Sequence, residues 1–223
     1  MSTYSAQPSG HEVRSAKTRS QLIEAAIEVI GAVGYEGAST RALAKTANAT
    51  LSAIPYHFGG KKELYLAAAH MIADYAAGRF QEAVSVLEEG DSPDMAIRLE
   101  QAFTNFLHVI LENVEPHSWT SFVARCAYDN DEAFAVIYGQ AIAPLIERLV
   151  RVASEISGRS PDDEVLRLRV SAMVTAIISF RFLGGIMSRG MAWAEIQPGS
   201  IEQIGGMVRD LCRGDFLAIH RNQ

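Results

Sequence analysis

Residues 39–64 read STRALAKTANATLSAIPYHFGGKKEL, and this stretch determines how the N-terminal part of the chain folds. Ser39 is a good N-cap for a short helix over residues 40–47, and Asn48 tolerates the left-handed backbone that a sharp turn requires. Thr50 is placed to cap a second short helix. Two short helices joined by a three-residue turn have the dimensions of a helix-turn-helix.

Side chains at the predicted crossing of these two helices meet the steric demands of that motif. Ala44 is small where the second helix passes over the first, and Ile54 and Leu43 supply the apolar contact between them. Pro55 raises a difficulty, because a proline beyond the first helical turn clashes with the carbonyl four residues earlier, which is that of Leu51. The second helix must therefore start late, be irregular in its first turn, or kink.

The flanking sequence predicts further helices on both sides of the motif. Apolar residues recur at helical spacing over residues 16–33, and Gly34 follows as the expected C-cap. Lys61 opens a long helix that runs past Tyr75. Later helical segments are expected over residues 94–113, 119–128, 131–158, 162–187 and 201–219. With no alternating β-branched run in the chain, the sequence predicts an all-α fold of about nine helices.

Charge is distributed unevenly along the 223 residues. From Arg14 to Lys62 there are seven lysines and arginines against three glutamates, a net charge of +4, whereas the remaining residues carry 13 against 23, a net charge of −10. A basic module joined to an acidic body suggests a nucleic-acid partner for the module. We expect a disordered tail over 1–15, a helix-turn-helix DNA-binding domain over 16–62, and a helical effector-binding and dimerisation domain over 63–223.

The second helix of the motif would enter the major groove of DNA and present its exposed side chains to base edges. These side chains offer apolar contacts and a single hydroxyl; they are Leu51, Ser52, Ala53 and Pro55. Groups suited to phosphate contact, which positions a protein without reading sequence, surround them. They are Thr40, Tyr56 and His57, and Lys61 at the N-terminus of the following helix.

Residues 18–65, with the runs TRSQLIEAA, STRALAKTA and YHFGGKKELY, resemble the DNA-binding domain of TetR-family transcriptional regulators. The body is similar to the CecR-like branch of that family in FVAR at 122–125, IAPLIERLV from 142, and FRFLGGIMSRGMAW at 180–193. The resemblance implies a homodimer that represses transcription from a palindromic DNA operator and is released by a small-molecule effector. It also implies phosphate contacts at Thr40, Thr50, Tyr56, His57 and Lys61.

Two departures from the family pattern fall inside the motif. Pro55 stands where a second tyrosine is common, and Gly59 and Gly60 stand where a lysine and a small residue are common. One hydrogen-bond donor and one positive charge are lost by these changes. The preferred DNA half-site therefore cannot be copied from better-known relatives.

The family would place a ligand pocket within the body. Its candidate apolar walls, which could equally be ordinary core, are Phe103, Phe106, Trp119, Phe122 and Phe180. Arg125 and Arg181 lie in apolar helical stretches, where each either pairs with a carboxylate or anchors an anionic or polar effector. Dimerisation should use the last two long helices, where Gly184, Gly185, Gly205 and Gly206 indicate either close helix approach or helix bends.

Other function classes find little support in the sequence. It contains no nucleophile elbow, phosphate loop or paired zinc histidines, so we expect no catalytic residue, no metal and no cofactor. We interpret Cys126 and Cys212 as small core residues. Without a signal peptide, and with an apolar run over 170–180 too short for a bilayer, a cytoplasmic protein without membrane contact is expected. The alternatives are an activator, a ligand-independent DNA-binding protein, or a helical enzyme.

Overall fold

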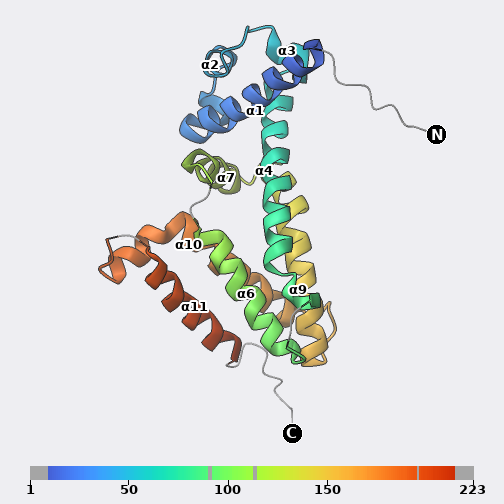
Figure 1. Cartoon of the computed structure of the whole chain (residues 1–223), viewed down its shortest axis with the longest axis vertical. Coiled ribbons are helices and arrows are strands. Elements are labelled where there is room, and N and C mark those ends of the chain that lie inside the picture. Colours follow the sequence, from blue (N-terminus) through green and yellow to red (C-terminus); the bar gives the residue numbers. More distant parts are fainter. Residues whose placement is uncertain (1–9, 90–91, 113–114, 195, 214–223) are drawn as a thin grey trace, which may run out of the picture. The chain divides into compact units, whose positions relative to one another are not determined.

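The computed structural model describes residues 10–89, 92–112, 115–194 and 196–213, and Figure 1 shows that these residues are helical almost throughout. In chain order the elements are α1 (Gly10–Gly37), α2 (Thr40–Thr46), α3 (Ala53–Phe58), α4 (Lys61–Ala83), α5 (Val86–Glu89), α6 (Met95–Leu111), α7 (His117–Asp129), α8 (Glu132–Ile137), the π-helix η1 (Tyr138–Ile142), α9 (Ala143–Ser157), α10 (Glu164–Gly190) and α11 (Pro198–Arg213).

The predicted all-α fold is confirmed, since no strand occurs in the residues that the structure covers. Elements α8, η1 and α9 follow one another without a break and correspond to one predicted helix. Counted that way, the predicted nine helices are all present, and the four-residue α5 is an addition. The predicted ends of two helices, at residues 113 and 219, lie outside the described residues.

The chain forms two compact units, which we call the helix-turn-helix unit and the body. The helix-turn-helix unit comprises Met1–Ile72 and Glu115–Ile137, and the body comprises Ala73–Val114 and Tyr138–Gln223. This division differs from the predicted boundary after Lys62. The first turns of α4 bury Leu64 and Tyr65 in the helix-turn-helix unit, and α7 returns to the same unit to pack along α1.

Helix α1 provides the largest apolar face of the helix-turn-helix unit. Leu22, Ala26 and Ile30 are almost fully buried at the spacing that the sequence predicted. The helix starts at Gly10 rather than Ala16, so residues 10–15 are helical and only 1–9 of the predicted tail lie outside the described residues. Gly34 breaks the helix as expected, with a φ of 78° that favours glycine, and one further turn ends at Gly37.

The two helices of the motif confirm one predicted cap and correct the other. The Ser39 hydroxyl accepts a hydrogen bond of 3.1 Å from the Ala42 N–H, and Asn48 is left-handed with a φ of 49°. The prediction that Thr50 caps the second helix was wrong: α3 starts at Ala53, and the Thr50 hydroxyl lies 3.1 Å from that of Ser52. Pro55 is thus the third residue of α3, inside the first turn, where proline is tolerated.

The body is built on a continuous apolar core contributed by α6, α9 and α10. Phe103, Phe106 and Leu149 are fully buried within it, together with Val170 and Ile177. By length and composition alone, the stretches Glu132–Ser157 and Glu164–Gly190 could also span a membrane. Apolar helices of helical protein cores meet the same criterion, so this finding does not favour a membrane location.

Both cysteines are held as thiols, and burial raises the pKa of Cys126 and of Cys212 to about 12. Because the thiolate is the reactive species, the native protein should react slowly with dithiodipyridine at pH 8. Both thiols should react at once in guanidinium chloride. Rapid labelling of the native protein, followed by absorbance, would contradict the burial of these side chains.

Candidate nucleic-acid interface

Helix α3 buries one apolar side chain in its own unit and exposes others to solvent. Ile54 is 1% exposed, whereas Leu51, at the turn that precedes the helix, is 53% exposed. Ser52 and Pro55 are exposed as well, and Ala53 is half-buried. The surface predicted to face base edges is therefore open in the structure, and it offers apolar groups and one hydroxyl.

Aromatic side chains lie at the C-terminal end of this surface. Tyr56 is 72% exposed, and its ring stands edge-on to that of half-buried His57, with the centroids 4.8 Å apart. The contact restricts both rings while leaving the phenol hydroxyl in solvent. Both side chains can then donate hydrogen bonds to a neighbouring phosphate, which is the role that the sequence predicted for them.

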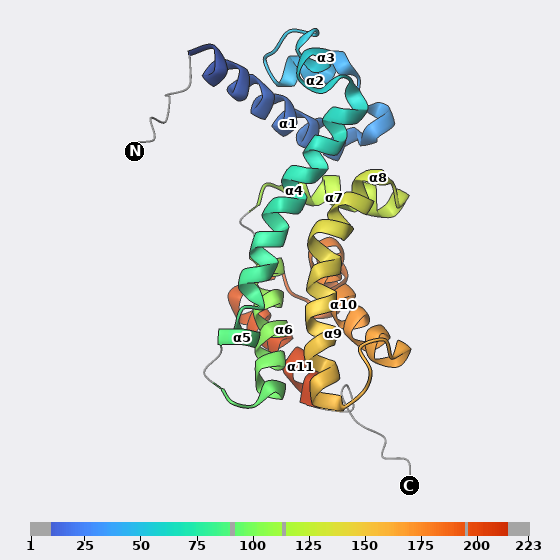
Figure 2. The ribbon, with the colours of Figure 1, turned by 90° about the vertical axis from the view of Figure 1, so that its right-hand side faces the viewer.

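Two further predicted residues occupy the first positions of helices beside α3, and Figure 2 shows α2 and α3 next to each other. Thr40 is exposed at the start of α2, and Lys61 opens α4. The Lys61 ammonium lies 4.2 Å from the centroid of the Tyr35 ring, a cation–π contact that holds the long side chain near the N-terminus of α4.

Arg19 belongs to this region, although sequence reasoning counted it only in the charge balance. Its guanidinium carbon lies 5.0 Å from the centroid of the Phe58 ring, so α1 places an exposed cation beside the C-terminal end of α3. The basic bias of residues 14–62 was the available signal. Lys62, by contrast, is paired with Glu132 at 2.7 Å, and this carboxylate raises the pKa of the lysine.

Helix α7 contributes contacts that hold the unit together. The Arg125 guanidinium donates to the carbonyls of Gly31 and Ala32 at 2.8 and 2.7 Å, near the break in α1. Neither role predicted for Arg125 describes this contact, because its partners are backbone carbonyls of the helix-turn-helix unit. The signal was absent from the sequence, since Arg125 and Gly31 are 94 positions apart.

A second link joins α4 to the loop before α8. The Tyr65 hydroxyl donates a 2.6 Å hydrogen bond to Asp131, and burial, followed by this bond, raises the pKa of the phenol. Phe122, predicted as a pocket wall, is 1% exposed and packs against the Tyr65 ring, with centroids 5.2 Å apart. Trp119, another predicted wall, lies half-buried on the same helix α7.

The predicted ligand residues of the body are also engaged in structural contacts. Phe103 and Phe106 are fully buried core residues, and Phe180 is half-buried against the same core. Arg181 donates to the carbonyls of Ile110 and Glu112, at 3.1 and 3.2 Å, and so caps the C-terminus of α6. Within the described ranges, no group of three potential metal ligands converges.

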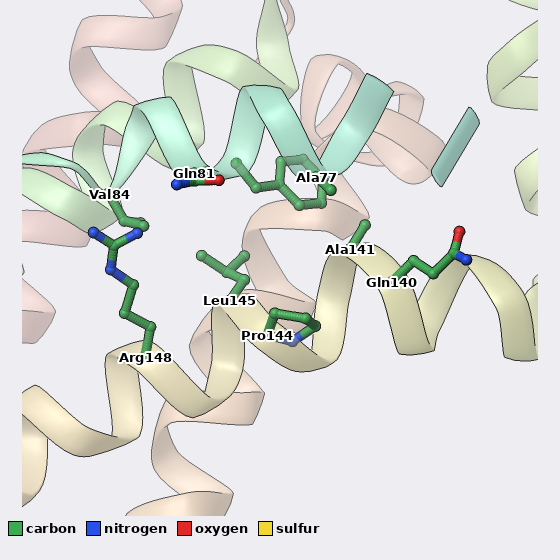
Figure 3. A pocket seen from close by; sticks show the side chains of 9 residues that line it. Ala77, Gln81, Val84, Gln140, Ala141, Pro144, Leu145 and Arg148 are labelled. Carbon is green, nitrogen blue, oxygen red and sulfur yellow. The ribbon is translucent and has the colours of Figure 1, made fainter. Parts of the chain in front are cut away.

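A cavity of about 220 Å³ does occur in the body, between α4 and the segment formed by η1 and α9 (Figure 3). None of the seven predicted ligand residues lines it. Its only charged lining residue is Arg148, and its remaining walls are apolar apart from two glutamines. The effector site predicted from the sequence and the cavity seen in the structure therefore involve different residues.

A short helix exposed on one face and flanked by groups suited to phosphate contact is typical of DNA-binding regulators of the helix-turn-helix class. Comparison with known families assigns the class more closely. The model for bacterial regulatory proteins of the tetR family matches residues 22–68, and the model for the C-terminal domain of the HTH-type transcriptional dual regulator CecR matches residues 96–218. The chain belongs to the TetR family of transcriptional regulators, in its CecR-like branch.

Individual relatives agree with this assignment. The chain is 29% identical to the HTH-type transcriptional dual regulator CecR of Shigella flexneri, over 92% of this chain and 93% of that one. It is 28% identical to the HTH-type transcriptional repressor AcnR of Corynebacterium efficiens, over 78% and 87%. These relatives are transcription regulators rather than enzymes.

Solved structures share the fold at low sequence identity. The transcriptional regulator FadR of Bacillus subtilis, solved in complex with stearoyl-CoA, matches with a TM-score of 0.61 and 14% identity, covering 87% of this chain and 97% of that one. A TetR-family regulator from Streptomyces coelicolor A3 matches with a TM-score of 0.54 and 20% identity, covering 86% and 89%.

Proposed function

We propose that the protein is a homodimeric transcriptional repressor that binds a palindromic DNA operator and is released by a small-molecule effector. The observation that carries the proposal is the geometry of α3. Ile54 anchors the helix inward, whereas Leu51, Pro55 and Tyr56 point outward between donors from the starts of α2 and α4. A DNA-binding regulator acts where the chromosome lies, which in a bacterium is the cytoplasm.

The homodimer is supported by exposed apolar side chains on the last two long helices. Leu168 and Ile186 on α10 are 67% and 70% exposed, and Met207 and Leu211 on α11 are also exposed. Apolar surface of this kind on a soluble protein marks an interface, and α10 and α11 of two copies can form a four-helix bundle about a two-fold axis.

The glycines of α10 and α11 give less support to this interface than the sequence analysis suggested, where they indicated either close helix approach or helix bends. A Cβ at Gly205 would lie 3.8 Å from Thr104 and 3.9 Å from Leu107, so this glycine faces α6 of its own chain. A Cβ at Gly184 would lie 3.1 Å from the Cδ1 atom of Ile196, and the preceding Leu183 has a φ of −116° and a ψ of 15° that depart from helical values, so contacts and a bend within its own chain account for this glycine. A Cβ at Gly185 would meet no described atom within 4 Å, so this glycine remains available for close helix approach.

Release by an effector requires two states that the effector binds with different affinity, by about 1–3 kcal/mol in typical allosteric proteins. In the DNA-binding state the two recognition helices would lie roughly one helical turn of DNA apart, about 34 Å. Helix α4 belongs to both units of the chain. We propose that its residues 61–78 transmit effector binding in the body to the spacing between the two recognition helices of the dimer. Equal spacing with and without effector would contradict this mechanism.

The direct test is to sequence the DNA fragments that the purified protein selects from a random library. We expect an inverted repeat bound by two chains, with transcription from a promoter that carries it reduced in vitro. A site without two-fold symmetry would overturn the dimeric operator. Increased transcription would instead favour the alternative that the protein is an activator. This alternative has a specific basis, because the relative from Shigella flexneri is named a dual regulator.

Lys61→Ala should weaken binding to the selected operator and to random DNA alike, because a phosphate contact carries no sequence information. The slope of log K against log salt should fall by about 1. Fluorescence anisotropy at several salt concentrations measures both. Arg151→Ala, which removes an exposed charge from α9 of the body, outside the basic stretch 14–62, is the matched control. A loss confined to the operator would contradict the phosphate role of Lys61.

A further inference from the structure

The cavity between α4 and α9 has an apolar body and one charged end. Its apolar walls are Ala77, Phe80, Val84, Ala141, Pro144 and Leu145. Figure 3 shows Arg148 reaching from α9 toward Val84 at one end of the cavity, with Gln81 on the facing wall. The combination suits a ligand with a short apolar part and a polar end.

An irregular stretch of backbone forms one wall. The π-helical turn η1 contributes Gln140 and Ala141, and Pro144 follows in the first turn of α9. Proline has no N–H to donate to the carbonyl four residues earlier, which for Pro144 is that of Gln140. The wider π turn accommodates this missing bond, and π turns recur at functional sites. Pro144 and the π turn beside it therefore form one irregular wall of the cavity.

Arg148 is held at the cavity by an ion pair with Glu88, and the two side chains differ in exposure to solvent. Its side chain is 26% exposed, whereas that of Glu88, on α5, is 58% exposed. The pair is bidentate: Nε donates to Glu88 at 2.8 Å, and a second guanidinium nitrogen contacts the other carboxylate oxygen. Both side chains keep access to solvent, so Glu88 can be rehydrated at low cost and another carboxylate can take its place beside the guanidinium.

We infer that this cavity binds a small monoanionic ligand, with a short aliphatic or aromatic body, whose acidic group replaces Glu88 beside Arg148. The inference rests on the proposed function, because it names the chemical class of the effector. One anionic group is assigned because Arg148 is the sole charged residue of the lining. A carboxylate reproduces the bidentate geometry that Glu88 now supplies.

The volume restricts the ligand further. About 220 Å³ lies below the range of roughly 300–1,000 Å³ that drug-sized ligands occupy. A short-chain or single-ring carboxylic acid suits this volume, and a long-chain acyl-CoA of the kind bound to the Bacillus subtilis relative exceeds it. The volume therefore favours a smaller ligand than the one bound to that neighbour.

Displacement of Glu88 gives the ligand an effect on α5. The backbone of this short helix is held by Arg98, which donates to the carbonyls of Leu87 and Glu88 at 3.3 and 3.4 Å, and its side-chain tie to α9 is the Glu88–Arg148 pair. Replacement of Glu88 by the ligand's acidic group would break the ion pair that connects α5 to α9. Because α5 follows α4 directly, the exchange acts at the end of the helix that enters both units.

The test measures the affinity of the full-length chain for benzoate, hexanoate and octanoate, and for the amide of each, by isothermal titration calorimetry. We expect at least one acid to bind about tenfold or more tightly than its amide, a preference that Arg148→Gln abolishes and Arg148→Lys partly retains. Glu88→Gln should tighten binding of the same acid several-fold, because it removes the internal competitor. Arg151→Gln, on the exposed side of α9, should change neither value.

Equal affinity for acids and amides, binding of none of the three acids, or weaker acid binding by Glu88→Gln would each overturn the inference. Thermal unfolding of every variant checks that the body is intact. The double variant Arg148→Gln with Glu88→Gln shows whether an effect of Arg148→Gln comes from the lost positive charge or from the carboxylate of Glu88 left without a partner.

Operator binding by the same variants distinguishes this inference from the proposed function. Failure of the wild type to select DNA would overturn the proposed function, whereas loss of acid preference with DNA binding intact concerns this site alone.

Discussion

Phe106→Ala should lower the free energy of unfolding of the protein by about 3–5 kcal/mol, the usual cost of removing a buried aromatic ring from a core. Phe106 is 0% exposed and stands edge-on to Phe80, with ring centroids 5.0 Å apart. The alanine would leave a cavity beside Phe80 in the core of the body, where α6, α9 and α10 pack on one another and cannot close it without moving.

This result separates the two roles that the sequence left open for Phe106. A ring in a ligand pocket is packed loosely, so its removal would cost little stability and would change ligand binding. Urea unfolding at fixed protein concentration measures the stability, with Phe180→Ala, at a half-buried position, as the graded comparison. A loss below about 1 kcal/mol at Phe106, outside the range for buried aromatic residues, would restore the pocket-wall interpretation.

Gly31→Val should destabilise the helix-turn-helix unit by about 3 kcal/mol, at the upper end of the cost of overpacking. A Cβ at Gly31 would lie 2.7 Å from the carbonyl oxygen of Ser118 and 3.3 Å from the N–H nitrogen of Phe122. Both are backbone atoms of α7, so no side-chain rotation relieves the overlap. The variant must move α7 away from α1, and with it the Arg125 contacts at Gly31 and Ala32.

Gly78→Val is the matched control, because Gly78 also lies inside a long helix, but a Cβ at this position would meet no described atom within 4 Å. Valine has a somewhat higher helix propensity than glycine, so the control should be neutral or slightly stabilising. Thermal unfolding followed by circular dichroism compares the two. Equal melting temperatures would show that α7 does not approach α1 as closely as these distances state.

The helix-turn-helix was readable from the sequence because its signals are local. The Ser39 cap, the left-handed Asn48 and the inward Ile54 each act within a few residues, and the structure confirms all three. Pro55 left three alternatives open, namely a late start, an irregular first turn or a kink, and the structure shows the late start of α3. The wrong prediction that Thr50 caps the helix came from placing the cap at the first suitable side chain before the apolar residues.

The roles of residues in the body were not readable, because helical periodicity identifies an inward face without showing what that face meets. Phe103 and Phe122 have similar sequence surroundings, yet one lies in the core of the body and the other in the helix-turn-helix unit. Arg125 and Arg181 both looked like candidates for carboxylate pairing or ligand anchoring. Both donate to backbone carbonyls of a helix distant in the chain, Arg125 to α1 and Arg181 to the C-terminal end of α6.

Local signals in the chain were enough to predict the helical class, the position of helix α3 and the family, because caps, turn residues and the spacing of apolar side chains act over a few residues. Three other features follow only from packing: α7 joins the helix-turn-helix unit, Gly31 must lack a side chain, and Arg148 rather than Arg125 or Arg181 lines a cavity. Each of these depends on close approach of segments far apart in the chain, and that approach is set by packing of the whole fold.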